Sequence, residues 1–150
     1  ERFKAVFELS QKHHFKTSLR SQAHTINTKS EMIVVDSLGE LISFYSLSDY
    51  AFVGGSLVPV GGHNVLEPIA LGVPVFCGPY MHNSKAICRD LEVAGAIRFV
   101  KDADDLVDAL VAMAHDHRYR QQQVTNASAV LLANQGTLAR CMEKIVEILD

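Results

Sequence analysis

The chain has 150 residues, of which 48% are hydrophobic and 21% charged, and its formal net charge is −3 at pH 7. This composition is typical of a globular protein and excludes a disordered or collagen-like chain. No apolar run is long enough for a membrane-spanning helix, and no signal segment stands at the start. The three cysteines, Cys77, Cys88 and Cys141, lie far apart, which argues against a disulfide framework and predicts a reducing compartment.

Charge is unevenly distributed along the chain. Residues 1–30 carry six Lys or Arg and two acids, whereas the remaining 120 residues carry eight Lys or Arg and fifteen acids. The plain interpretation of the basic segment is a solvated surface. The alternative is a face that meets anionic phosphate or membrane headgroups. No aromatic residues interleave with these basic residues in the pattern of a nucleic-acid-binding segment, so no nucleic-acid partner is expected.

Helices and strands are predicted to alternate along the chain. A first helix is predicted over residues 1–14 and a short strand over 15–20, followed by a polar loop at 25–30. Buried strands are predicted on apolar, β-branched runs at 32–36, 50–55, 73–78 and 97–100. Further helices are predicted at 40–49, 63–72, 84–94, after a cap at Asp102 or Asp104, at 118–134 and at 137–149. This order predicts an α/β fold with a parallel sheet, in which ligands bind beyond the carboxyl ends of the strands.

The first unusual strand-to-helix turn is Asp36–Leu41, with the sequence DSLGEL. Ser37 is expected to cap the following helix, and Gly39 allows a ligand to approach the backbone closely. Glu40 is expected in the first helical turn. Free amides and the helix dipole at such a turn favour an anion, although an Asp-Ser pair before a helix is more often only a cap.

The second turn, Gly54–Pro68, contains two Gly-Gly pairs and is expected to lead into a helix near His63 and Asn64. Exposed amides at Gly61–Val65 are predicted to cradle a phosphate. Glu67 is placed to accept hydrogen bonds from ribose hydroxyls, so the turn suits a nucleotide. The alternative is a tight loop in which Asn64 and Glu67 form a capping box.

The sequence contains few motifs that indicate any other kind of binding or catalytic site. The sequence has neither a Walker phosphate loop nor the Gly-x-Gly-x-x-Gly fingerprint of dinucleotide-binding folds. His63 and Glu67 are four residues apart without a third ligand nearby, so no metal site is expected. The segment Gly78–Ile87 either lines the cleft or caps the next helix at Asn83.

The ordered motifs DSLGEL, FVGGSL, GGHNVLEPIALGVPV and GPYMHNS resemble the Kdo (3-deoxy-D-manno-octulosonic acid) transferase family of lipopolysaccharide synthesis. The resemblance covers essentially the whole chain and matches the C-terminal half of that family. It implies an inverting GT-B glycosyltransferase, in which two Rossmann-like halves face a cleft. Residues 1–150 are then the nucleotide-sugar-binding domain, truncated at its N-terminal edge. The implied donor is CMP-Kdo, with no cofactor or metal, and the implied acceptor is a lipid A precursor (lipid IVA) bound by the other half.

The family motifs also assign residues. They imply that CMP is contacted at the first turn by Leu38, Gly39 and Glu40, and at the second by Asn64, Val65, Leu66 and Glu67, with Glu67 on the ribose. Ser37, Gly61, Gly62 and His63 are further candidates. Tyr80 and Ser84 depart from the family pattern GPHxxNF.

The resemblance places the catalytic base in the N-terminal half, so no catalytic residue is expected here and the chain alone is expected to be inactive. It implies an N-terminal anchor and a location at the cytoplasmic face of the inner membrane. Two alternatives remain: the donor half of a GT-B enzyme that uses a UDP-sugar, and a non-enzymatic nucleotide-binding module.

Overall fold

A computed structural model describes residues 2–26 and 29–135. Contacts between residues divide the chain into two compact units, Glu1–Phe44 and Tyr45–Asp150. The predicted helix at 137–149 lies outside the described residues. Within the described ranges, no helix combines the length and the apolar character needed to cross a membrane.

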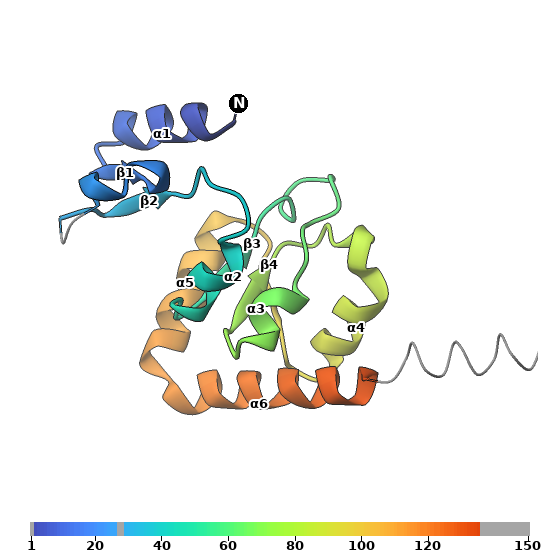
Figure 1. The fold of residues 1–150 in the computed structure, drawn as a ribbon. Coiled ribbons are helices and arrows are strands. Elements are labelled where there is room, and N and C mark those ends of the chain that lie inside the picture. The colour runs from blue at the N-terminus through green and yellow to red at the C-terminus, as the bar shows by residue number, and fades with distance from the viewer. Residues whose placement is uncertain (1, 27–28, 136–150) are drawn as a thin grey trace, which may run out of the picture. The chain divides into compact units, whose positions relative to one another are not determined.

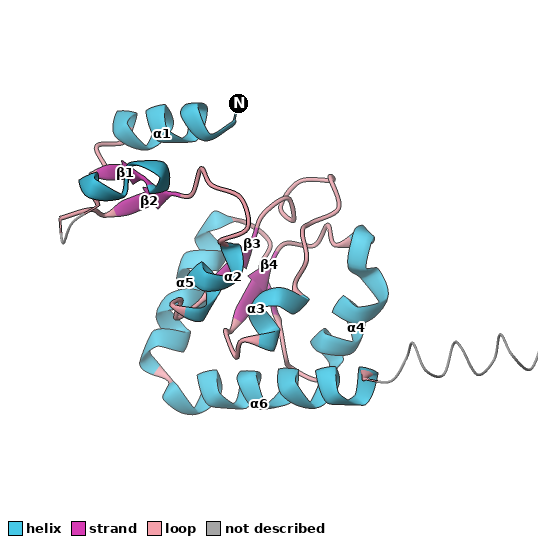
Figure 2. Cartoon of the chain, viewed as in Figure 1, coloured by secondary structure: helices cyan, strands magenta, loops and turns pink. Residues whose placement is uncertain are grey.

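The first unit contains α1 (Arg2–Lys12), β1 (Thr17–Leu19), the 3-10 helix η1 (Arg20–Thr25) and β2 (Met32–Val34). Strands β1 and β2 pair in parallel, with Ser18 opposite Ile33 (Figure 2). The predicted helix and both strands are confirmed, although each is shorter than expected. The apolar side chains of Phe3, Val6 and Leu9 on α1 stay between 42% and 55% exposed.

The division between the units falls within α2 (Leu41–Ser46), and the second unit begins at Tyr45. Its three-stranded parallel sheet has the order β3 (Ala51–Val53), β4 (Val75–Cys77), β5 (Arg98–Phe99), and a parallel sheet is predicted for alternating strands and helices. Figure 1 shows β3 beside β4. Asp102 caps α5 by accepting a 2.9 Å hydrogen bond from the Asp105 amide, as expected. The elements are β3 (Ala51–Val53), α3 (Leu66–Ala70), β4 (Val75–Cys77), the 3-10 helix η2 (His82–Ser84), α4 (Lys85–Val93), β5 (Arg98–Phe99), α5 (Ala103–His115) and α6 (His117–Asn134).

The helix predicted at 63–72 is confirmed only in part, since α3 begins at Leu66 rather than near His63. Asn64 therefore lies in the loop, and Val65 occupies the position that precedes the helix. The pattern of an Asn three residues before a Glu had suggested the earlier start.

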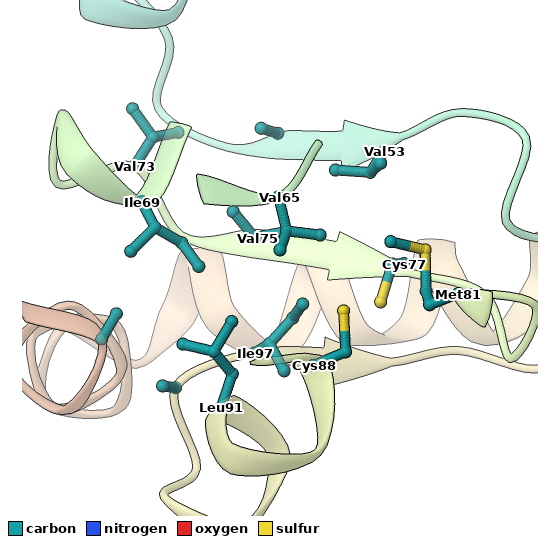
Figure 3. Close-up of a cluster of buried hydrophobic side chains, with 13 residues drawn as sticks. Val53, Val65, Ile69, Val73, Val75, Cys77, Met81, Cys88, Leu91 and Ile97 are labelled. Carbon is teal, nitrogen blue, oxygen red and sulfur yellow. The ribbon is translucent and has the colours of Figure 1, made fainter. Parts of the chain in front are cut away.

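The two faces of strand β4 contribute to separate hydrophobic clusters, because successive side chains of a strand point to opposite sides. Val75 and Cys77 join the larger cluster with residues of α3 and α4, as Figure 3 shows. Phe76 packs on the other side with Val100 and with Met113 of α5. Strand β4 is thus buried on both faces, as predicted. The outer strands are buried only in part, since Phe52 of β3 and Arg98 of β5 are exposed.

Ser56 connects the carboxyl ends of β3 and β4. Its fully buried hydroxyl donates to the carbonyl of Val53 and accepts a 2.7 Å hydrogen bond from the amide of Gly78. The two loops touch through their backbones here, since a Cβ atom on Gly78 would lie 2.2 Å from the carbonyl oxygen of Ser56. This contact determines where the loops after β3 and β4 leave the sheet.

Replacement of Ser56 by Ala should leave the buried Gly78 amide without an acceptor. We expect the Ser56→Ala variant to lose about 1–3 kcal/mol of unfolding free energy, measured by urea denaturation. Ser128→Ala is the matched control, because its hydroxyl also donates to a backbone carbonyl but is exposed on α6. A loss no larger than that of the control would show that the Ser56 bridge contributes little to stability.

Candidate functional site

The loop after β3 closes on itself through backbone hydrogen bonds. The amide of Gly62 donates to the carbonyl of Gly55 at 2.9 Å, and the amide of His63 donates to that of Gly54 at 3.2 Å. These bonds occupy two of the amides that the sequence suggested for a phosphate cradle. The phosphate site expected over Gly61–Val65 therefore has fewer free amides than the sequence predicts.

Gly61 and Gly62 are required by conformation, and the side chains of Asn83 and Met81 also crowd them. Their φ angles are +105° and +68°, values that side chains disfavour. A Cβ atom on Gly61 would lie 2.3 Å from Asn83 Nδ2, and one on Gly62 would lie 2.1 Å from Met81 Sδ. The loop after β4 is thus packed directly against the glycine turn.

Asn64 and Glu67 interact through their side chains. Asn64 Oδ1 accepts a 3.0 Å hydrogen bond from the amide of Leu66, and Asn64 Nδ2 donates to Glu67 Oε1 at 3.0 Å. A capping box would instead join Glu67 to the backbone amide of the cap residue. The alternative that Glu67 serves as a capping-box carboxylate is therefore wrong in its geometry, and Glu67 Oε2 has no hydrogen-bond partner among the described residues.

The amides of Asn64 and Val65 have no acceptor within the described part of the chain. Val65 is completely buried, backbone included, with its side chain in the larger hydrophobic cluster, so none of its atoms is open to a ligand in this conformation. A buried amide without an acceptor is rare and costs free energy. Asn64 is exposed, so its free amide is the donor that makes the end of the turn suitable for an anionic oxygen.

The turn of the first unit is held by η1. Arg20 Nη2 donates to Glu40 Oε1 at 2.6 Å, and the Ser37 hydroxyl donates to Glu40 Oε2. Asp36 accepts hydrogen bonds from the amide and the hydroxyl of Ser21, at 2.7 and 2.6 Å. Arg20 and Ser21 were not singled out by sequence reasoning, because nothing local links them to a turn fifteen or more residues away.

Two expectations about this turn need correction. Ser37 bonds the Glu40 side chain rather than capping a helix amide, and Glu40 precedes α2 instead of lying in its first turn. Gly39 has a φ of +80° with no atom within 4 Å of an added Cβ, so its conformation rather than crowding requires glycine. Leu38, at the tip, is 93% exposed.

Both carboxylates of the turn are stabilised in their charged form. The Ser37 hydroxyl, followed by the Arg20 guanidinium, lowers the pKa of Glu40, and hydrogen bonds from Ser21 lower the pKa of Asp36. Because these pKa values are depressed in the folded state, the stability they contribute is present above the unfolded values of 4.5 and 3.8. It is lost as the pH falls through the folded values.

Removal of the Ser37 hydroxyl should raise the pKa of Glu40 toward its ordinary value of 4.5. We expect Ser37→Ala to produce the larger increase and Arg20→Met a smaller one, measured by NMR titration of the Glu40 side-chain carboxyl carbon. Arg98→Met, which breaks the exposed ion pair between Arg98 and Asp105, is the control and should leave the Glu40 titration unchanged. A Glu40 titration that is the same in all three variants would contradict the hydrogen-bond network.

Side chains that could bind a metal ion do not cluster in the described part of the chain. Residues 2–26 and 29–135 contain no group of three or more His, Cys, Asp or Glu side chains arranged to hold a metal ion. His63, one of the candidates, is exposed beside the glycine turn.

Comparisons with known proteins place this fold and these turns in a family. Residues 10–130 match the family model described as glycosyl transferases group 1. The chain therefore belongs to the group 1 glycosyl transferase family.

Within that family, the chain is similar to 3-deoxy-D-manno-octulosonic acid transferases. The Haemophilus influenzae enzyme is 38% identical over 151 residues, covering 100% of this chain and 35% of that protein. The Aquifex aeolicus enzyme is 39% identical over 99 residues, covering 66% of this chain and 27% of that protein. The chain thus spans about a third or less of the length of these relatives.

Among solved structures, the chain is similar to the C-terminal CMP-Kdo binding domain of WaaA from Acinetobacter baumannii. That domain is 38% identical, with a TM-score of 0.84, and the match covers 87% of this chain and 68% of that one. The resemblance to the C-terminal half of Kdo transferases, and the α/β GT-B fold that it implied, are confirmed.

Proposed function

We propose that this chain is the donor-binding part of an inverting glycosyltransferase that transfers Kdo from CMP-Kdo to a lipid A precursor. The observation that carries the proposal is the likeness to the Acinetobacter CMP-Kdo binding domain over 87% of this chain. On this proposal the two compact units belong to one nucleotide-sugar-binding domain, and the acceptor and the catalytic base belong to the other half of the enzyme. On this proposal the chain by itself converts no CMP-Kdo.

The second turn is proposed to hold the nucleotide. The unpaired amide of the exposed Asn64 donates to the phosphate, and the free Oε2 of Glu67 accepts a hydrogen bond from a ribose hydroxyl. The motif also assigns Val65, whose buried amide has to be uncovered when the donor binds. The hydrogen bond from Asn64 keeps the Glu67 side chain at the end of the same turn. The motif also assigns a CMP contact to Leu66, which is half-buried beside this turn, and Gly61, Gly62 and His63 remain further candidates.

A CMP contact is also proposed for Leu38, Gly39 and Glu40, because the DSLGEL motif assigns them this role. Their turn is firmly held by η1, and both carboxylate oxygens of Glu40 already accept hydrogen bonds. Glu40 therefore presents a charged, fixed carboxylate, which accepts a further hydrogen bond without first losing side-chain entropy.

The chemistry required of this half is stabilisation of a leaving group. When an acceptor hydroxyl attacks the anomeric carbon of Kdo, the bond to CMP breaks and negative charge gathers on its phosphate. Amides that are already fixed and lack acceptors stabilise that charge without reorganisation. The chain's own residues bind and orient the donor, and a carboxylate outside these 150 residues removes the acceptor proton.

The Glu67→Ala variant tests the ribose contact. Hydrogen bonds to a charged group contribute about 1.5–3 kcal/mol, so CMP affinity should fall by about one to two orders of magnitude. Glu67→Gln keeps the shape but loses the charge, so its affinity should lie between those of wild type and Glu67→Ala. Isothermal titration of CMP into this chain measures the dissociation constants.

The control is Asp108→Ala, which removes an exposed carboxylate from α5 and should leave CMP affinity unchanged. A thermal melt of each variant separates binding from folding. An unchanged CMP dissociation constant with a lowered melting point would mean that Glu67 is structural. Parallel titrations with UMP and UDP address the alternative donors, because tighter binding of the uridine nucleotides would favour a UDP-sugar enzyme.

We also propose that the full protein works at the cytoplasmic face of the inner membrane, with the basic segment 1–30 near anionic lipid. Lys4, Lys12 and Lys16 are all exposed, and the ion pair from Lys4 to Glu8 is long, at 3.8 Å. Each cation near such a surface contributes about 1 kcal/mol. Co-sedimentation with anionic vesicles should decrease with salt and after Lys→Gln changes at these positions. Binding that ignores both changes would leave this segment as an ordinary solvated surface.

A further inference from the structure

A pocket of about 640 Å³ lies in the second unit, outside the residues assigned to the nucleotide. It is bounded by the loop after β4, one face of α4 and the end of β5. Its volume is within the range of small-molecule sites in proteins, which is about 300–1,000 Å³. Among its lining residues are Tyr80, His82, Lys85, Arg89, Glu92 and Phe99.

The pocket has positively charged groups without an ion-pair partner among residues 2–26 and 29–135. Lys85 and Arg89 are four residues apart on α4 and therefore share one helix face. Neither forms an ion pair or a hydrogen bond with any residue in the described ranges. Glu92, one turn further along α4, is the single acidic residue of the lining. The cations are thus available to an anion, and Glu92 offers acceptors for hydroxyl groups.

The remaining lining is apolar and rigid. Met81 and Cys88 are only 4% and 2% exposed, so they form a floor that belongs to the core. Figure 3 shows both side chains in the hydrophobic cluster, close to Cys77. The rings of Tyr80, which is 42% exposed, and Phe99 supply flat apolar walls. Such surfaces suit the C–H face of a sugar ring.

We infer that this pocket is a second binding site, for an anionic sugar. The carboxylate or phosphate of the sugar pairs with Lys85 and Arg89, its ring packs against Tyr80 and Phe99, and its hydroxyls donate to Glu92. The acid group could come from either of two substrates of the proposed reaction, the sugar acid of the donor or a phosphorylated sugar of the acceptor. The shared chemistry is a sugar with one fixed negative charge.

The pocket is connected to the glycine turn through Met81. Its side chain forms part of the pocket floor and also fills the space above Gly62, where a Cβ would lie 2.1 Å from its sulfur. The two candidate sites are therefore neighbours, because the loop after β4 packs on the glycine turn after β3, but they use different residues. The inference concerns the pocket alone, and CMP titration tests the nucleotide turn separately.

The experiment compares four probes by NMR or calorimetric titration of this chain: free Kdo, glucosamine 1-phosphate, glucose and inorganic phosphate. We expect at least one anionic sugar to bind more tightly than both glucose and phosphate. The double variant Lys85→Gln/Arg89→Gln should weaken that binding by about tenfold or more, and added salt should weaken it too. CMP affinity of the double variant should stay unchanged, as should its melting temperature.

The control is Lys101→Gln/Arg118→Gln, which removes two exposed cations outside the pocket lining. Tighter binding of Kdo assigns the pocket to the donor, and tighter binding of glucosamine 1-phosphate assigns it to the acceptor. The inference is overturned if no anionic sugar binds, if glucose or phosphate binds equally well, or if both double variants behave alike. A parallel loss of CMP affinity in the Lys85/Arg89 variant would also overturn it, because the pocket would then belong to the nucleotide site.

Discussion

Direct backbone contact between the loops after β3 and β4 is the constraint on which the second unit depends. Gly78 lies against the carbonyl of Ser56, while Gly61 and Gly62 lie against Asn83 and Met81. At Gly78 no Cβ fits without a shift of the Ser56 backbone. Hydrogen bonds from the amide of Tyr80 to the Ser56 carbonyl and from the amide of Asn83 to the Gly61 carbonyl also join the two loops. The unpaired amides after the glycine turn and the pocket beside α4 both take their positions from this contact.

The two candidate turns are stabilised by different physics. In the first unit, charged and hydroxyl side chains from η1 hold Asp36 and Glu40, so that turn responds to pH and to salt. In the second unit, backbone hydrogen bonds and packing hold the glycine turn, and the Glu67 carboxylate is joined to it only through the side chain of Asn64.

Much of this architecture is predictable from sequence because it rests on local patterns. The β-branched runs around Val34, Val53 and Val75 identify parallel strands, although only the strand at Val75 is buried throughout. Asp102 identifies the start of α5. The start of α3 is wrong by two or three residues, because Asn64 satisfies the Leu66 amide from outside the helix. Arg20 could not be found, since its partner lies twenty residues away and only the folded chain brings the two together. The pocket could not be predicted either, because its lining residues come from the loop after β4, from α4 and from β5, which only the folded chain brings together.

The exposure of Leu38 affects the thermodynamics of any binding at its turn. A large apolar side chain that is 93% exposed at the tip of a rigid turn keeps water ordered around it in the free protein. Any ligand or protein surface that covers Leu38 releases that water, and the association then has a negative heat-capacity change. Binding at this turn would grow more exothermic as temperature rises, although the turn's other groups are polar.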